Sequence, residues 1–335
     1  MLLSICMPTL NRASYIGETL DSILPQLAED MEVVVVDGGS GDGTAEVVGK
    51  RSAACPRIRY HLTAHLAEGK PKPSNAGYDR DCDAAVQLAQ GKYCWLLPDD
   101  DPLVPDALST LRKYLESGVA LVVVNAEIRS KDLSRQLVPQ RMVLAEDVTV
   151  ARGDASGLMT VAGQYLSYAG GVVVRRDWWL ARDRERHYGT GFIHVATIFQ
   201  SPADLDAVVV SRPLIRLRYG NALWTDRAFM IWMFHWPELI WSLPLEEAAK
   251  RAVIPREPWT QWSRLLLYRA RGIFNRAQYR LLRERKKLSW PTRAVASCIT
   301  WIPGGLLNLL GLAVLFLAGR RRSLAFVDLR LGGRS

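Results

Sequence analysis

Along the first 125 residues, short runs of β-branched residues alternate with longer stretches in which apolar residues recur at helical spacing. This alternation is typical of βαβ units and a parallel sheet. Strands are predicted at residues 3–7, 32–36, 57–62, 93–97 and 120–124. Helices are predicted between them, over residues 15–27, 42–48, 79–90 and 105–116. The pattern therefore indicates an α/β fold, in which a mostly parallel, Rossmann-like sheet is flanked by helices.

The alternation becomes less regular after residue 125, and residues 164–174 are predicted to form a strand, a loop and a second strand. Beyond residue 221 the character changes. Six Trp or Phe residues crowd residues 224–241, and a basic amphipathic helix is predicted over residues 263–287. We therefore expect residues 1–220 to form the α/β domain and residues 221–335 to form a second, helical region.

Polar residues directly follow three of the predicted strands. In open parallel sheets, ligands bind beyond the carboxyl ends of the strands. Each polar cluster alone is also what a turn rich in capping residues would show. Three clusters at one edge of a sheet predict a ligand site. They are Pro8, Thr9, Asn11 and Arg12 after the first strand, Asp37 and Gly38 after the second, and Asp99, Asp100 and Asp101 after the fourth.

The three adjacent carboxylates of Asp99–Asp101 repel one another and call for a cation or for a solvated loop. Oxygen ligands without a nearby His or Cys favour Mg²⁺ or Mn²⁺, which would take further ligands from water and phosphate oxygens. We therefore predict a metal-diphosphate site here. The alternative is a solvated turn.

Asp37 ends a run of four Val residues, 33–36, that is typical of a buried central strand. Its carboxylate accepts hydrogen bonds, so a base N–H or a ribose hydroxyl of a nucleotide would suit it. Gly38 and Gly39 leave room for a ligand to approach the backbone. The alternative is that Asp37 forms only an Asx turn to Gly39.

Charge is distributed unevenly along the chain. The formal net charge is +9, but residues 251–335 alone carry seventeen Lys or Arg against three Asp or Glu. Residues 297–319, within this basic region, have no charged side chain. This combination favours a membrane surface with anionic lipid over nucleic acid as the partner. The five cysteines form no CxxC pair, which fits a reducing cytoplasm better than a disulfide framework.

The apolar stretch 297–319 is interrupted by Pro303-Gly304-Gly305, and basic residues flank it on both sides. The segment after the interruption is too short to span a bilayer. Both flanks are expected on the cytoplasmic side. We therefore predict a re-entrant or interfacial apolar hairpin, which would hold the protein at the cytoplasmic face of the plasma membrane.

Three motifs cover the ends of the predicted strands: Pro8-Thr9-x-Asn11-Arg12, Val36-Asp37-Gly38-Gly39-Ser40-x-Asp42-Gly43-Thr44 and Ala89-x-Gly91-Lys92-Tyr93-x-Trp95-Leu96-Leu97-Pro98-Asp99-Asp100-Asp101. Their order and spacing resemble those of the family-2 glycosyltransferases of GT-A fold. The first 125 residues resemble this family strongly. The stretch from Gly77 to Asp83 and the later Gly189-Thr190-Gly191-Phe192-Ile193-His194 resemble an abequosyltransferase-like subgroup of bacterial surface-polysaccharide enzymes.

The resemblance implies metal-dependent transfer of a sugar from a nucleoside-diphosphate sugar to a polyprenyl-linked saccharide in O-antigen or capsule-like synthesis. Pro98 stands where relatives carry the first metal-motif carboxylate, which makes Asp100 the first choice as metal ligand. The other implied roles are donor-loop contacts for Pro8, Thr9, Asn11 and Arg12, nucleobase contact for Asp37 with Gly38, donor contacts for Asp79 and Asp83, ribose or diphosphate contact for Asp99, and metal ligation for Asp101.

The catalytic base is harder to place. Many inverting relatives carry an acidic pair about ninety residues after the metal motif, and no such pair stands in this sequence. His194 follows a Gly-x-Gly turn and could act as a base near neutral pH. The alternative is that His194 packs among its apolar neighbours.

Three other functions remain open at this point. A polyprenyl-phosphate glycosyltransferase would use the same donor site. A non-catalytic, membrane-bound nucleotide-binding protein would have lost metal carboxylates, whereas Asp99–Asp101 are all present. A nucleotidyltransferase usually has a basic, Gly-rich phosphate loop after its first strand, where this chain offers only Arg12.

Overall fold

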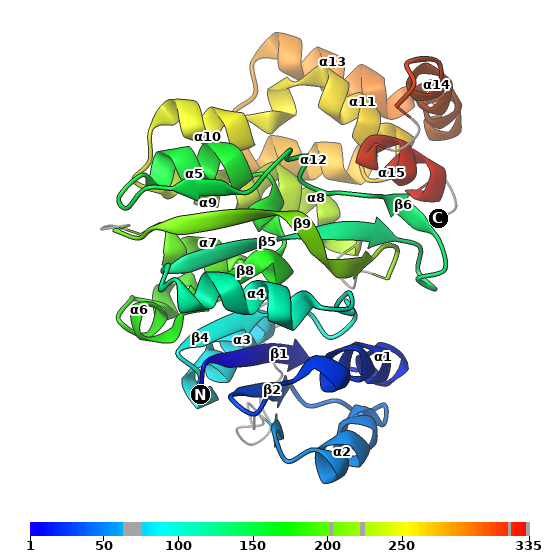
Figure 1. Cartoon of the computed structure of the whole chain (residues 1–335). Helices are drawn as coiled ribbons and strands as arrows, with labels where there is room; N and C mark the ends of the chain where they lie inside the picture. Colours follow the sequence, from blue (N-terminus) through cyan, green and yellow to red (C-terminus); the bar gives the residue numbers. More distant parts are fainter. Residues whose placement is uncertain (63–75, 201–203, 222–224, 321–322, 333–335) are drawn as a thin grey trace, which may run out of the picture. The chain divides into compact units, whose positions relative to one another are not determined.

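The structure is a computed structural model that describes residues 1–62, 76–200, 204–221, 225–320 and 323–332 (Figure 1). The chain divides into two units. The first comprises Met1–Arg218 and Ser242–Val253, and the second comprises Tyr219–Trp241 and Ile254–Ser335. The boundary predicted after residue 220 falls here after Arg218, and Ser242–Val253 returns to the first unit.

Within the described residues of the first unit, nine strands form one sheet in the order β3-β2-β1-β4-β8-β5-β9-β7, with β6 beside β5. Figure 1 draws these strands as arrows. Their bounds are β1 Leu3–Thr9, β2 Met31–Asp37, β3 Ile58–Leu62, β4 Tyr93–Leu96, β5 Leu121–Arg129, β6 Gln136–Val138, β7 Val148–Val150, β8 Val172–Arg175 and β9 Ala207–Arg218.

The first four strands form the parallel part of the sheet. Every residue of β1 and β2 is buried, as expected for strands covered on both faces. β2 pairs in parallel with β1 and β3, and β4 pairs in parallel with β1. Beyond β4 the sheet is mixed, because β8 runs antiparallel to both β4 and β5 while β9 is parallel to β5. The predicted α/β fold and its five strands are confirmed.

Helices connect the strands where the sequence predicts them, as α1 (Ala13–Ile23), α2 (Thr44–Ala54), α3 (Ala76–Leu88) and α4 (Ala107–Glu116). α1 ends earlier than predicted, and the 3-10 turn Leu24–Gln26 follows it. The remaining helices of the first unit are short: α5 Ala155–Ala162, α6 Arg176–Leu180, α7 Ile193–Ile198 and α10 Glu247–Val253.

The strand-loop-strand predicted over residues 164–174 is half wrong. Only its second strand forms, as β8, and two 3-10 turns, Tyr165–Ser167 and Ala169–Gly171, stand in place of the first. Aromatic rings explain the difference. A Cβ atom on Gly171 would lie 2.3 Å from the ring of Tyr165, and the carbonyl of Gly170 accepts a 2.8 Å hydrogen bond from the indole of Trp95.

The second unit is helical. Its core gathers aromatic side chains from the Trp-rich segment and the basic segment, among them Phe229, Phe234, Trp259 and Phe274. The basic helix predicted over residues 263–287 is divided into two helices, because Gly272 adopts a left-handed φ of 78° and Asn275 caps a new helix. The helices are α8 Ala228–Met230, α9 Trp236–Ser242, α11 Trp262–Ala270, α12 Arg276–Arg285, α13 Trp290–Trp301, α14 Gly304–Leu317 and α15 Leu324–Gly332, with a π-helical turn at Ile231–His235.

The predicted apolar hairpin falls on α13 and α14. Among the helices that the structure describes, none alone has the length and hydropathy of a membrane span. α13 and α14 meet that requirement together, but they are bent by 96° at the break between them. Association of this hairpin with a membrane stays a prediction.

Close backbone packing at Gly91 gives a stability prediction. A Cβ atom there would lie 2.5 Å from the backbone nitrogen of Ser4 and 2.7 Å from the backbone carbonyl carbon of Leu3. We expect Gly91→Ala to lower the free energy of unfolding by about 1–3 kcal/mol, because strand β1 cannot move away without losing its pairing. Urea unfolding of the full chain measures this.

Gly49→Ala is the matched control. Gly49 is exposed on α2 and its added Cβ would meet nothing within 4 Å. This substitution should raise the free energy of unfolding by about 0.5–1 kcal/mol, because alanine favours helix. Equal effects of the two substitutions would contradict the close packing described for Gly91.

Candidate functional site

The loop after β1 is tied to the loop after β2. Pro8 has no N–H to donate, and it lies beyond Cys6, the last residue of β1 that pairs with β4. Asn11 adopts a left-handed φ of 54°. Its side-chain oxygen accepts a 2.9 Å hydrogen bond from the N–H of Gly41, and its own N–H donates to the hydroxyl of Ser40 at 2.8 Å. Asn11 therefore orders the two loops.

Asp37 is fully buried at the end of β2. One carboxylate oxygen accepts the N–H groups of Gly39 and Ser40 at 2.9 and 2.7 Å, and the other accepts the hydroxyl of Tyr60 at 2.7 Å. The Asx turn considered as an alternative is thus present. Tyr60 was not among the residues predicted from the sequence. Its pKa is raised by burial and by its hydrogen bond to Asp37. Contact of Asp37 with a nucleobase stays a prediction.

Arg12 meets the carboxylates that follow β4. Its Nε lies 3.5 Å from Asp99, and its Nη2 lies 3.3 Å from Asp100. Burial, together with the charge of Asp100, raises the pKa of Asp99 to about 7, against the opposing charge of Arg12. The structure therefore brings together residues that the sequence predicts from two separate strand ends.

Asp101 has a different set of partners. One of its oxygens accepts a 2.6 Å hydrogen bond from the hydroxyl of Tyr168, and the other accepts the N–H of Arg218 at 2.6 Å. The Arg218 guanidinium donates to the carbonyl of Asp100 at 3.0 Å and pairs with Glu18 at 2.6 Å. Asp101 therefore anchors the loop of Asp99–Asp101, which we call the carboxylate loop, to β9. This favours Asp100 over Asp101 as a metal ligand.

The carboxylate loop suits a cation that is shared with a phosphate ligand. Within the described ranges, no group of three or more His, Cys, Asp or Glu side chains is placed to hold a metal. Asp99 and Asp100 nevertheless converge on one cation, the guanidinium of Arg12. Mg²⁺ is commonly held by one or two carboxylates and completed by water and substrate phosphates. The residues present fit an ion of that kind.

Asp79 was predicted to contact the donor, but its carboxylate is used inside the fold. It accepts the N–H of Gly191 at 2.8 Å and that of Ile193 at 3.2 Å, which holds the turn that begins α7. Burial raises the pKa of Asp79 to about 6, against the hydrogen bonds from these N–H groups. The contacts indicate a structural role for Asp79.

Asp83 also joins an internal network. The indole of Trp179 and the hydroxyl of Tyr188 donate to it at 2.8 and 2.7 Å, and the Nε of Arg184 lies 2.8 Å from it. A carboxylate with these partners is not offered to a sugar hydroxyl. The arrangement therefore does not support the donor-binding role predicted for Asp83.

His194, the candidate base, is packed inside the first unit. Its side chain is 1% exposed, and its Nε2 lies 2.8 Å from the carbonyl oxygen of Leu166. Burial lowers the pKa of His194 to about 4, against the hydrogen bond to Leu166. This burial favours the packing alternative, and a role of His194 as the base stays a prediction.

Comparison with known proteins identifies the family. Residues 4–166 match the model of glycosyl transferase family 2. Abequosyltransferase RfbV of Salmonella typhimurium is 31% identical over 235 residues, which cover 66% of this chain and 68% of the relative. The chain belongs to glycosyl transferase family 2. The resemblance stated from the sequence is therefore confirmed, and the chain is a glycosyltransferase.

Further relatives agree with this assignment. The GalNAc(5)-diNAcBac-PP-undecaprenol beta-1,3-glucosyltransferase of Campylobacter jejuni is 33% identical over 135 residues, 40% of this chain and 41% of the relative. Residues 1–349 of S. aureus TarS superpose with a TM-score of 0.56 at 16% identity, covering 100% of this chain and 91% of that one. A mannosyltransferase of Pyrobaculum calidifontis, in complex with GDP-Man and Mn2+, has a TM-score of 0.50 at 16% identity, covering 99% and 86%. The two structural likenesses support the GT-A fold alone.

The lowered pKa of His194 predicts a pH dependence of stability. An unfolded His binds a proton near pH 6.5, whereas folded His194 does so near pH 4. Between these values the unfolded chain holds more protons, so His194 should reduce stability by about 3 kcal/mol as the pH falls from 6.5 to 4. His194→Gln keeps a donor for Leu166 and removes the titration.

Urea unfolding of both forms at pH 7 and pH 4 measures this difference. We expect the wild type to lose more stability than His194→Gln over this range, and we expect turnover to change less than tenfold. A parallel loss in both forms would contradict the burial described here. A fall in turnover of roughly 10²–10⁴ would instead restore His194 as the base.

Proposed function

We propose that this glycosyltransferase moves a sugar from a nucleoside-diphosphate sugar to a saccharide carried on a polyprenyl lipid, in bacterial surface-polysaccharide synthesis. The observation that carries the proposal is the convergence of Arg12 with Asp99 and Asp100. These residues lie at the carboxyl ends of β1 and β4, and the ordered loop of Asp37 follows the neighbouring strand β2. A nucleoside diphosphate has the shape and charge to cross these strand ends.

Each residue has a chemical task in this proposal. The Arg12 guanidinium pairs with the donor diphosphate, to which a planar fork of N–H groups is suited. Asp100, with Asp99 beside it, holds Mg²⁺ or Mn²⁺. When bound, such an ion offsets the negative charge that develops on the nucleoside-diphosphate leaving group. Asp37 keeps the Gly38–Ser40 loop in the form that receives the base and ribose.

The names of the relatives favour a lipid-linked saccharide over polyprenyl phosphate as the acceptor. One relative is a transferase named for a saccharide joined to undecaprenol through a diphosphate. Another is an abequosyltransferase. We therefore keep transfer to polyprenyl phosphate itself as the second candidate. Transfer assays with both kinds of lipid distinguish them.

We further propose that the second unit docks on the cytoplasmic face of the plasma membrane. Helices α13 and α14 expose large apolar side chains, and exposed cations stand on α12 and around it. Apolar and basic groups together suit a surface of anionic lipid. The apolar side chains are Trp290, Val295, Trp301, Leu306, Leu309, Leu310, Val314, Phe316 and Leu317. The cations are Arg276, Arg280, Arg283, Arg285, Lys287 and Arg293.

The way α14 is held favours an interfacial helix. The side-chain amide of Asn308 is buried and donates to the carbonyls of Ala270 and Leu329 at 3.2 and 2.7 Å. Gly311 permits the close approach of α15, since a Cβ there would lie 2.8 Å from Leu329. One side of α14 is thus fixed to α11 and α15, and the exposed leucines lie on the rest of its surface.

Asp100→Asn tests the donor site. We expect turnover to fall at least about 10²-fold, because the substitution removes a charge that holds the metal at the leaving group. The melting temperature should not fall. Nucleoside-diphosphate release with a panel of nucleotide sugars and Mn²⁺ measures turnover, and calorimetry measures Mn²⁺ binding in the presence of nucleoside diphosphate.

Asp106→Asn is the matched control, because Asp106 is an exposed carboxylate near the site in sequence but outside it. Asn tolerates the left-handed φ of 63° at this position. This variant should keep wild-type turnover. Near-normal turnover of Asp100→Asn at saturating Mn²⁺ would refute the metal assignment.

Leu309→Ser with Leu317→Ser tests the membrane surface. These side chains are 68% and 84% exposed, so the double variant should fold. We expect it to bind vesicles of anionic and neutral phospholipid at least about tenfold more weakly than the wild type, because each leucine would bury apolar area in the bilayer. Flotation of vesicles measures the bound fraction.

Val143→Ser is the control for this experiment. Val143 is 89% exposed but belongs to the first unit. This variant should bind vesicles as the wild type does. Unchanged binding of the leucine double variant would mean that α14 is not the docking surface.

A further inference from the structure

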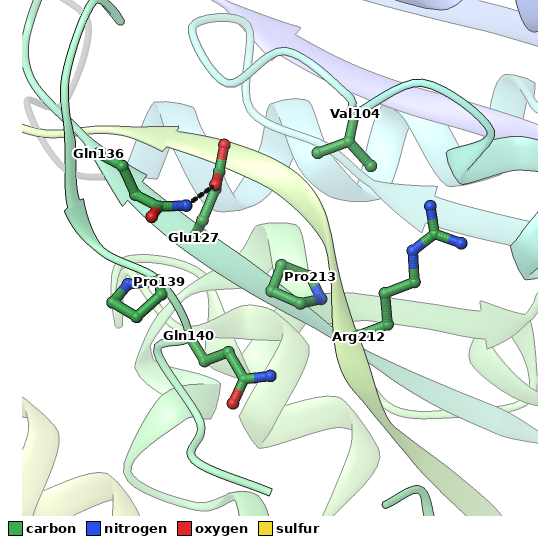
Figure 2. Close-up of a pocket in the computed structure, with 7 residues that line it drawn as sticks. All are labelled: Val104, Glu127, Gln136, Pro139, Gln140, Arg212 and Pro213. Carbon is green, nitrogen blue, oxygen red and sulfur yellow. Dashed lines mark hydrogen bonds between the residues drawn. The ribbon is translucent and has the colours of Figure 1, made fainter. Parts of the chain in front are cut away.

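A pocket of about 400 Å³ opens in the first unit among residues of β5, β6 and β9 (Figure 2). This volume lies within the range of small-molecule sites, about 300–1,000 Å³. In Figure 2, Gln136 and Glu127 stand on one side, joined by a hydrogen bond, and Arg212 stands on the other with Pro213 between. The lining residues are Val104, Glu127, Gln136, Pro139, Gln140, Arg212 and Pro213.

The wall that carries Pro139 and Gln140 is fixed by β5. The side chain of Asn125 donates to the carbonyl of Met142 at 2.7 Å and accepts the N–H of Met142 at 3.0 Å. The N–H of Arg141 donates to the carbonyl of Ala126 at 2.8 Å. The pocket is therefore formed before any ligand arrives, which lowers the entropic cost of binding.

Strand β9 connects the pocket to the carboxylate loop. It supplies Arg212 and Pro213 to the pocket, and its last residue, Arg218, donates to Asp101. Val104 also lines the pocket beside this strand, because its N–H donates to the carbonyl of Leu214 at 3.0 Å. It is three residues from Asp101, so their backbones are at most about 10 Å apart. A ligand in the pocket would lie close to the transfer site.

Aromatic rings form a second connection between the pocket wall and the carboxylate loop. The Arg141 guanidinium lies over the rings of Tyr165 and Tyr168, at 5.2 and 5.3 Å from their centres. The hydroxyl of Tyr168 donates to Asp101. The segment that forms the pocket wall therefore also contacts the residue that holds the carboxylate loop in place.

The chemistry of the lining suits a neutral molecule rich in hydroxyl groups. Glu127 already interacts with Arg129 at 2.5 Å and with Arg216 at 3.6 Å, so its charge is balanced. The amides of Gln136 and Gln140 both donate and accept hydrogen bonds, and Arg212 donates. The rings of the two prolines offer apolar faces, which match the C–H faces of a sugar ring. An anionic ligand would meet a carboxylate and a single lining cation.

We propose that this pocket binds a sugar unit of the acceptor that lies beyond the unit receiving the transferred sugar. The inference rests on the proposed function, and it gives the acceptor class as a saccharide of at least two units. The pocket then selects acceptors by length, because only a longer saccharide reaches from the transfer site into it.

Gln140→Ala, Arg212→Ala and their combination test the pocket in the full chain. Wild type and variants are assayed with a panel of phytanyl-diphosphate-linked hexose monosaccharides and disaccharides. We expect the double variant to raise the KM for disaccharide carriers at least about tenfold and to leave the KM for monosaccharide carriers within twofold. Arg135→Ala, an exposed arginine next to β6 that does not line the pocket, should match the wild type.

Two kinetic results would overturn the inference while the proposed function stands. One is a disaccharide KM within twofold of the wild type in the double variant. The other is an equal rise for monosaccharide and disaccharide carriers, which would point to a general disturbance. If the wild type releases no nucleoside diphosphate with any donor, the proposed function fails separately.

Saturation-transfer NMR with the free disaccharides tests whether the pocket binds them, without requiring turnover. A signal from the wild type that is lost in the double variant and kept in Arg135→Ala supports the pocket even where transfer is not seen. Equal signals from the wild type and the double variant, or no signal from the wild type with any disaccharide, overturn the inference. Melting temperatures confirm that each variant folds.

Discussion

The burial of three adjacent carboxylates at the end of β4 is the constraint on which the site depends. The loss of water on burial, and then the repulsion from Asp100, raise the pKa of Asp99 and Asp101. Groups from three distant segments oppose this cost: Arg12 after β1, Tyr168 before β8 and Arg218 at the end of β9. Formation of the mixed sheet therefore also assembles the site, since these groups meet only when β8 and β9 join the parallel strands.

The three carboxylates have different partners and therefore different roles. Asp101 is held by Tyr168 and Arg218 and fixes the loop, whereas Asp99 and Asp100 face Arg12. A divalent cation would reduce the repulsion between Asp99 and Asp100, and a diphosphate would in turn supply further oxygen ligands to it. Our account therefore couples binding of the cation to binding of the donor.

The sequence was sufficient to predict the parallel strands and the cluster at their ends, because both depend on local patterns and on the geometry of parallel sheets. It was not sufficient to separate donor-binding from structural carboxylates. Asp79 and Asp83 are occupied by Gly191 and Trp179, which are about a hundred residues away. The burial of His194 against Leu166 likewise has no local signature in the sequence. The contact of Tyr60 with Asp37 and the pocket beside β9 likewise form only through tertiary packing.

Anomalous X-ray scattering from crystals soaked with Mn²⁺ and a nucleoside diphosphate tests the central claim most directly. Our account predicts one Mn²⁺ peak bound by Asp100 and the diphosphate, with Asp99 beside it and Arg12 turned toward the phosphates. A nucleotide bound at these strand ends with Mn²⁺ elsewhere, or with no Mn²⁺ at saturating concentration, would contradict it.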